Sequence, residues 1–139
     1  MIKKIIIFFS FFFIVYKSFF TQVNAEVRII AKIGNNVVTN IDLINEKKYL
    51  LALNKDIRNI NEDNLLLIAK DSLFRETIKK LELQKYYKLN NKNPIFDNSI
   101  KQIYESIGYT SLNEFKKYLS SQNLKYDEIY KKIEIETLW

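Results

Sequence analysis

Two short apolar stretches on either side of a turn signal predict a β-hairpin near residue 30. Residues 27–33, Val-Arg-Ile-Ile-Ala-Lys-Ile, have the composition of a strand. The Gly-Asn-Asn sequence at 34–36 predicts a turn, because Gly and Asn tolerate positive φ angles. Val37 and Val38 then begin a short return strand. A lone hairpin is only marginally stable in water, so we expect this one to pack against the next part of the chain.

Apolar residues at helical spacing predict about five helices after the hairpin. We expect them from near Thr39 to near Asn54, from Asn61 to Leu89, from Asp97 to near Gly108, from Ser111 to Asn123, and from Tyr126 or Asp127 onward. The predicted fold class is therefore mainly α, with about five helices and a short N-terminal β-hairpin.

Each predicted helix has an apolar face that we expect to pack in the core. The faces of the first two helices hold Ile41, Ile44, Lys48 and Leu51, joined by Leu43 and Leu50, and then Leu67, Phe74, Ile78 and Leu81. The faces of the last three hold Ile100, Ile103, Tyr104 and Ile107; Phe115, Tyr118 and Leu119; and Tyr126, Ile129, Tyr130 and Ile133.

Local signals set the expected helix ends. Pro94 interrupts the helical pattern because it pushes Asn93 out of the α region. Gly108 and Asn123 stand where a helix can end in the left-handed conformation. The spacing of a capping box, in which two residues satisfy each other's backbone N–H groups, is found in Thr39 with Asp42 and in Ser111 with Glu114.

The first 25 residues have the pattern of a secretory signal peptide. Lys3 and Lys4 precede an apolar run at residues 5–16, which is too short for a comfortable membrane span of about 20 residues. Val23 and Ala25 fit a small-residue cleavage site, so we expect cleavage between Ala25 and Glu26. The alternative is an uncleaved anchor. The chain is thus divided into a signal peptide at 1–25 and one domain at 26–139.

Composition narrows the chemistry of that domain. The whole chain has 22 basic and 16 acidic residues, and the first 25 residues contain three lysines and no acid, so residues 26–139 carry a net charge of +3. This mild balance, spread over many Lys and Glu residues, does not indicate nucleic-acid binding. The chain has no Cys and no His, which removes the usual nucleophile pairs and the commonest metal ligand.

The acidic residues predict helix caps and solvated faces instead of a reaction centre. Asp42 and Glu114 are best explained as caps, and Glu62 and Asp63 suit the positive end of a helix dipole. Glu134 and Glu136 are two apart and do not share a helix face. Ordinary solvated pairs are expected for Glu76 with Lys80 and for Glu82 with Lys85. No catalytic residue, cofactor site or metal site is predicted.

Eight tyrosines occur after residue 25. They can be half-buried residues at the core edge, with the ring packed and the hydroxyl in water, or they can line an amphipathic groove for extended, aromatic-rich segments. The first interpretation is favoured for any single tyrosine, and no client-binding residue is assigned.

Several segments occur in a recognisable order. Residues 30–42, Ile-Ala-Lys-Ile-Gly-Asn-Asn-Val-Val-Thr-Asn-Ile-Asp, give a strand, a turn, a second strand and a capped helix. They are followed by Leu81-Glu82-Leu83-Gln84 on the long helix, Ile95 in a loop, Ser-Leu-Asn-Glu-Phe at 111–115, and a turn into the last helix at 123–130. This order resembles the N-terminal (SurA N) domain of SurA-type periplasmic chaperones of the parvulin-type peptidyl-prolyl isomerase family, over essentially all of residues 26–139.

The resemblance implies a periplasmic holdase that binds unfolded outer-membrane proteins or other exported polypeptides. Such proteins usually carry parvulin-type isomerase domains after this region, and a returning C-terminal helix and strand, so we expect the domain to be incomplete at its C-terminus. No stable membrane insertion is expected after signal cleavage. The alternatives are the non-catalytic leader of a peptidyl-prolyl cis-trans isomerase, a membrane-tethered foldase anchored by residues 5–20, and a helical adaptor.

Overall fold

The computed structural model describes residues 26–89 and 93–139, so the predicted signal peptide at 1–25 lies outside the described residues. The elements are β1 Ile29–Ile33, β2 Asn36–Thr39, α2 Asn40–Leu53, the 3-10 turn η1 Asp56–Asn59, α3 Glu62–Leu83, α4 Pro94–Ser106, α5 Leu112–Ser121 and α6 Tyr126–Leu138. The predicted fold class, mainly α with a short N-terminal hairpin, is confirmed.

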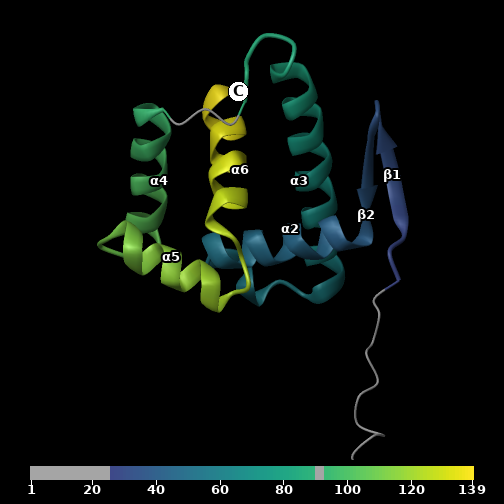
Figure 1. Cartoon of the computed structure of the whole chain (residues 1–139). Coiled ribbons are helices and arrows are strands. Elements are labelled where there is room, and N and C mark those ends of the chain that lie inside the picture. The colour runs from purple at the N-terminus through teal and green to yellow at the C-terminus, as the bar shows by residue number, and fades with distance from the viewer. Residues whose placement is uncertain (1–25, 90–92) are drawn as a thin grey trace, which may run out of the picture.

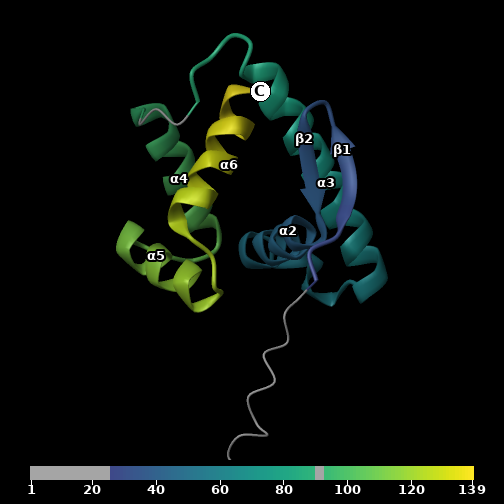
Figure 2. The ribbon, with the colours of Figure 1, turned by 45° about the vertical axis from the view of Figure 1, so that its right-hand side comes forward.

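The helices are arranged around α2 (Figure 1). Figure 1 shows α2 across the base of the molecule, with α3 and α6 rising from it side by side. The hairpin packs on α3, and α4 and α5 lie on the side of α6. The view in Figure 2, turned by 45°, also places the end of α6 beside the end of α3. The two halves of the molecule therefore meet where α3 packs on α6 and where the end of α2 enters the core.

The hairpin packs on the neighbouring helices as expected. β1 and β2 pair antiparallel, with Ala31 opposite Val38, and Val38 is buried. Gly34 has a φ of +57° in the turn. A Cβ atom at Gly34 would lie 3.4 Å from Leu81 Cδ1, so the turn approaches α3 closely.

Two helix ends differ from the prediction. Helix α3 ends at Leu83 and not at Leu89, and Tyr87 N donates to Leu83 O at 2.8 Å as the chain turns away. Residues 84–88 are exposed, so a longer helix would bury no further apolar surface. Helix α4 begins at Pro94 and not at Asp97, because proline suits the first helical position and Asn93 Oδ1 caps Ile95 N at 3.0 Å.

The core lies where the end of α2 meets the last three helices. Its buried residues are Ala52, Ile100, Ile107, Phe115, Leu119, Leu124, Ile129 and Ile133, with half-buried tyrosines around them. The apolar faces predicted for the last three helices are therefore confirmed. Gly108 and Asn123 have the predicted positive φ angles, +95° and +56°.

The apolar faces predicted for the first two helices are only partly buried, and three of their residues are exposed. Ile44 on α2 is exposed, and on α3 Leu67 is 64 % exposed and Ile78 53 % exposed. The buried residues of these helices are instead Glu46 and Ala52 on α2, and Leu65, Ala69 and Leu83 on α3. The reason is that the sides of α2 and α3 that face α6 carry charged side chains, which find partners there.

Among the residues that the structure describes, no helix is both long enough and apolar enough to cross a membrane.

Candidate functional site: a cleft beside a buried charged cluster

A cleft of about 470 Å³ opens between α2, α3 and α6. Most of its lining is polar. The charged residues are Asp42, Glu46, Glu76, Lys80, Glu128, Lys131, Lys132 and Glu134, and the apolar ones are Leu73, Leu89 and Ile135. A hollow with this lining can hold the backbone and polar side chains of a bound segment, and its few apolar residues offer limited hydrophobic contact.

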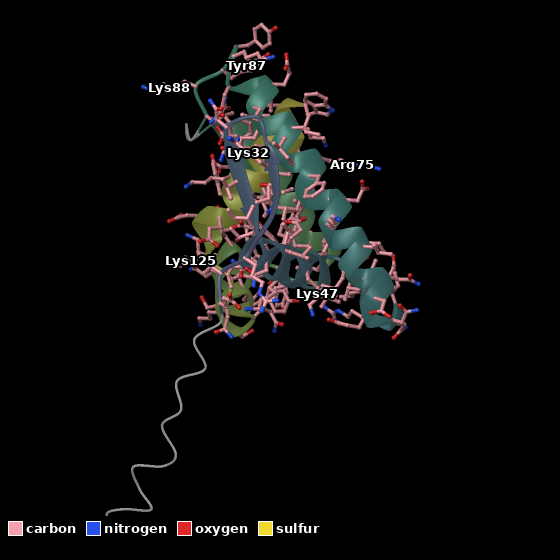
Figure 3. All side chains as sticks on the ribbon, turned by 90° about the vertical axis from the view of Figure 1, so that its right-hand side faces the viewer. Lys32, Lys47, Arg75, Tyr87, Lys88 and Lys125 are labelled. Carbon is pink, nitrogen blue, oxygen red and sulfur yellow. The ribbon has the colours of Figure 1, made fainter. Side chains whose placement is uncertain are left out.

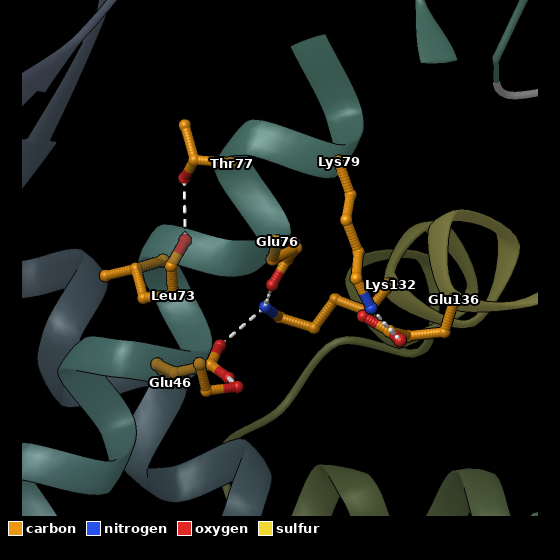
Figure 4. Close-up of polar contacts among 8 residues, drawn as sticks. Glu46, Leu73, Glu76, Thr77, Lys79, Lys132 and Glu136 are labelled. Atoms are coloured by element: carbon orange, nitrogen blue, oxygen red, sulfur yellow. Dashed lines mark hydrogen bonds and ion pairs between the residues drawn. The ribbon is translucent and has the colours of Figure 1, made fainter. Parts of the chain in front are cut away.

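One lysine connects all three helices at the edge of this cleft (Figure 4). Lys132 on α6 donates a hydrogen bond to Glu46 Oε2 on α2 at 2.6 Å and another to the Glu76 carboxylate on α3. Glu46 is only 1 % exposed. We call Glu46, Glu76 and Lys132 the charged cluster. With both carboxylates ionised it has a net charge of −1.

Neighbouring side chains complete the charged cluster. Ser72 Oγ donates to Glu46 Oε1 at 2.6 Å, and the Lys132 ammonium lies 4.9 Å from the centre of the Tyr49 ring. A second hollow, of about 370 Å³, is lined by the same residues together with the Lys79–Glu136 ion pair, whose Nζ and Oε2 atoms are 2.6 Å apart. The charged cluster therefore separates two hollows and fixes α6 against α2 and α3.

Burial and mutual charge shift the acid–base properties of these groups. Desolvation raises the pKa of the Glu76 carboxyl, and the ammonium of Lys132 opposes that shift without cancelling it. Desolvation alone would lower the pKa of Lys132, but Glu76 and Glu46 outweigh it, so its pKa is raised. Burial and the charges of Glu46 and Glu76 also raise the pKa of the Tyr49 phenol. At neutral pH Lys132 is a cation and Tyr49 is neutral.

The raised pKa of Glu76 predicts a pH-dependent contribution to stability. The usual pKa of a glutamate carboxyl is 4.5, and in the folded state the pKa of Glu76 is higher. The fold therefore loses stability as the pH rises from 4.5 through the folded-state pKa, because the folded state binds the proton more tightly than the unfolded state does. The difference in unfolding free energy between the wild type and Glu76→Gln should therefore shift in favour of the variant across this window. Urea unfolding of both proteins between pH 4.5 and pH 7 measures it. A difference that stays constant with pH would contradict the prediction.

The acidic residues predicted as caps fulfil that role. Thr39 N donates to Asp42 Oδ2 at 2.8 Å, and Asp42 N donates to Thr39 Oγ1 at 3.3 Å, which is a complete capping box. Glu114 N donates to Ser111 Oγ as predicted, but the Glu114 carboxylate accepts from Thr110 N and Oγ1 instead of from Ser111 N. These hydrogen bonds lower the pKa of Glu114.

Among the predicted solvated pairs, one is confirmed and one is wrong. Glu82 pairs with Lys85 on the exposed side of α3. Glu76 does not follow the predicted pairing with Lys80, because Lys132 binds it in the partly buried charged cluster.

The convergence of Glu46 and Glu76 on Lys132 was not predicted from the sequence. A signal was present in the sequence, because a charged residue stands at the spacing of core residues on both α2 and α6. Glu46 precedes Tyr49 by three residues, and Tyr49 packs against the core. Lys132 lies three residues after the buried Ile129 and three before the buried Ile135. Opposite charges at such positions on two helices are typical of a buried ion pair.

The tyrosines divide into two groups. Tyr49, Tyr104, Tyr109, Tyr118, Tyr126 and Tyr130 pack against the core, as the favoured interpretation predicts. Tyr118 OH also donates to Ala52 O at 2.8 Å and accepts from Arg58 Nη2 at 3.3 Å. Tyr86 and Tyr87 are exposed in the turn after α3.

The outer side of α3 presents an apolar stripe formed by Leu67, Phe74 and Ile78. These residues are spaced by seven and four positions and therefore share one side of the helix. Phe74 is half-buried, and the Lys70 ammonium lies 5.6 Å from its ring centre. Figure 3 shows Arg75, whose position is next to Phe74 in the sequence, projecting from α3 into solvent. We call these three residues the outer stripe.

No group of three or more acidic residues within the described ranges has the arrangement of a metal site. Comparisons of the chain with protein-family models, with curated proteins and with solved structures found no match.

Proposed function

We propose that this protein is a periplasmic holdase for unfolded outer-membrane proteins, comparable to the N-terminal region of SurA-type chaperones. A holdase needs apolar surface that competes with the self-association of a client, and it needs no catalytic group. Contacts must be weak and distributed so that the client can leave again.

The outer stripe is the observation that carries the proposal. Leu67 and Ile78 keep more than half of their surface in water, although their spacing is that of a core face. Exposed apolar side chains aligned along one helix are typical of surfaces that bind other polypeptides. Charged neighbours, including the Asp71–Arg75 ion pair at 2.9 Å, keep this face soluble when it is empty.

The cleft beside the charged cluster supports the same proposal in a second way. Its lining combines acceptors and donors from three helices, so an extended segment could satisfy backbone groups there while its apolar side chains contact the protein elsewhere. A polar cleft and a separate apolar stripe suit a client whose strands alternate polar and apolar residues.

Light scattering tests the proposed activity. A urea-unfolded porin is diluted into buffer with and without the exported protein, and an unfolded soluble protein serves as the control client. Selective suppression of porin aggregation supports the proposal, whereas no suppression by a demonstrably folded protein contradicts it.

The location is tested separately by the N-terminal residue of the protein recovered from the periplasm: Glu26 supports export with cleavage, and Met1 in a membrane fraction supports the anchored alternative.

The outer stripe can be tested with a pair of substitutions. In Leu67→Gln/Ile78→Gln, each change removes roughly 1 kcal/mol of apolar contact, so the concentration needed for half suppression should rise about 30-fold. The helix should persist, because glutamine is a good helix former. Ile95→Gln/Leu112→Gln, which changes exposed apolar residues on α4 and α5, is the matched control and should leave suppression unaltered. Equal losses in both variants would argue against a role for the outer stripe.

A further inference from the structure

The turn after α3 exposes two adjacent tyrosines between two lysines. Residues 85–88 read Lys-Tyr-Tyr-Lys. Tyr86 is 75 % exposed, and about half of the surface of Tyr87 is exposed. Unlike the other tyrosines of the described residues, these two do not pack on the core. Two adjacent exposed rings make a contiguous apolar patch, and such patches are typical of surfaces that bind a partner.

An exposed tryptophan lies at the same end of the molecule. Trp139 is 62 % exposed, and the Lys79 ammonium lies 5.9 Å from the centre of its ring. Figures 1 and 2 both place the end of α6 beside the end of α3, below the turn that comes after α3. Figure 3 shows Tyr87 and Lys88 at this end, directed away from the helices. We call Lys85, Tyr86, Tyr87, Lys88 and Trp139 the tip.

The charge around the tip is positive. Residues 79–89 contain four lysines and one acidic residue, Glu82, and Glu136 on α6 pairs with Lys79, which leaves a balance of +2. This density exceeds that of residues 26–139 as a whole, whose net charge of +3 is spread over 114 residues. An anionic surface would therefore be attracted to this end of the protein in preference to others.

The residue types and the shape of the tip favour a lipid surface over a smaller ligand. Tyrosine and tryptophan concentrate at the membrane–water interface, where the ring lies among the headgroups and the polar group stays hydrated. Lysines beside them interact with anionic headgroups. The turn projects beyond the ends of α3 and α6 (Figure 1). The hollow that residues 84–89 line is wide open to solvent, whereas small-molecule sites enclose most of their ligand.

We propose that the tip docks this protein on membranes that contain anionic lipids. The tyrosine and tryptophan rings enter the headgroup layer, and Lys85 and Lys88 face the lipid phosphates. The contact is peripheral and reversible, and it leaves the outer stripe free. It is independent of the holdase activity proposed above.

Trp139 is the only tryptophan of the chain and reports on docking directly. The exported protein is titrated with vesicles of phosphatidylglycerol and phosphatidylcholine, and separately with vesicles of phosphatidylcholine alone. Docking should shift the Trp139 emission to shorter wavelength with the anionic vesicles, and lipids brominated near the headgroup should quench it. Raised salt should weaken the effect, because it screens the lysines. This readout concerns the tip whether or not residues 1–25 are retained.

Substitutions in the turn test which residues act. Lys85→Gln/Lys88→Gln should lower the partition coefficient on anionic vesicles about 25-fold, at about fivefold per lysine. Tyr86→Ser/Tyr87→Ser should lower it about tenfold through lost apolar contact. Lys117→Gln/Lys125→Gln is the control for charge: it removes two exposed lysines elsewhere, and Lys125 has an ion pair to Glu128 like that of Lys85 to Glu82. It should change the partition by less than about twofold.

Three outcomes would overturn the proposal. Equal emission shifts with neutral and anionic vesicles would exclude recognition of anionic lipid. An equal loss in the Lys117/Lys125 control would show that net charge acts without a defined site. A shift produced by a single-stranded oligonucleotide and not by vesicles would assign the tip to nucleic acid instead. Circular dichroism establishes that each variant is folded before it is compared.

Discussion

Replacing Lys132 by methionine is expected to lower the free energy of unfolding by about 3–5 kcal/mol. Methionine fills much of the volume of the lysine stem but removes the ammonium that lies between two carboxylates. Glu46 is almost completely buried, so its charge cannot be solvated by water when its partner is lost. Urea unfolding followed by circular dichroism measures the effect.

The matched control removes a carboxylate in place of the ammonium. Glu76→Gln leaves Lys132 paired with Glu46, and the amide oxygen can still accept a hydrogen bond from Lys132. We expect a change within about 1 kcal/mol at pH 7, because the lysine keeps an opposite charge. The asymmetry follows from the composition of the charged cluster, two acids to one base. If Glu76→Gln costs as much as Lys132→Met, the cluster is not organised around the lysine.

Phe115→Ala is expected to destabilise the protein by a similar amount, about 3–5 kcal/mol. Phe115 is completely buried in the core, where its ring centre lies 6.0 Å from that of Tyr104. The core draws on four helices, so the surrounding residues cannot collapse fully into the cavity. Thermal or urea unfolding provides the measurement, with Leu112→Ala, an exposed position of the same helix, as the control expected to change stability by no more than about 0.5 kcal/mol. A Phe115→Ala protein as stable as that control would show that α5 is not part of the cooperative core.

The second half of the fold could be predicted from the sequence because its signals are local. The pattern through Ile100, Phe115 and Ile133 is repeated within each helix, and turn residues with positive φ separate the helices. Each of these signals lies within a few positions of the structure that it determines. The same holds for the capping box of α2, in which both partners are three residues apart.

The first half could not be predicted in the same way because its burial is decided by distant partners. Glu46 is buried because Lys132, 86 positions later, neutralises it. A pattern that counts charged residues as exposed assigns the opposite side of α2 and α3 to the core, which explains the errors at Ile44, Leu67 and Ile78. The cleft and the charged cluster depend on the same long-range contacts, so neither could be predicted from local patterns.

The position of α2 also determines the order in which the protein can fold. Ala52 belongs to a core whose other members begin at residue 100, and its carbonyl accepts from a tyrosine 66 positions later. Closing such long loops costs entropy that is recovered only when the distant contacts form. The hairpin, α2 and α3 therefore have no complete core until α6 arrives. A chain that passes through a membrane N-terminus first would remain without its stable fold until nearly all of residues 26–139 had emerged.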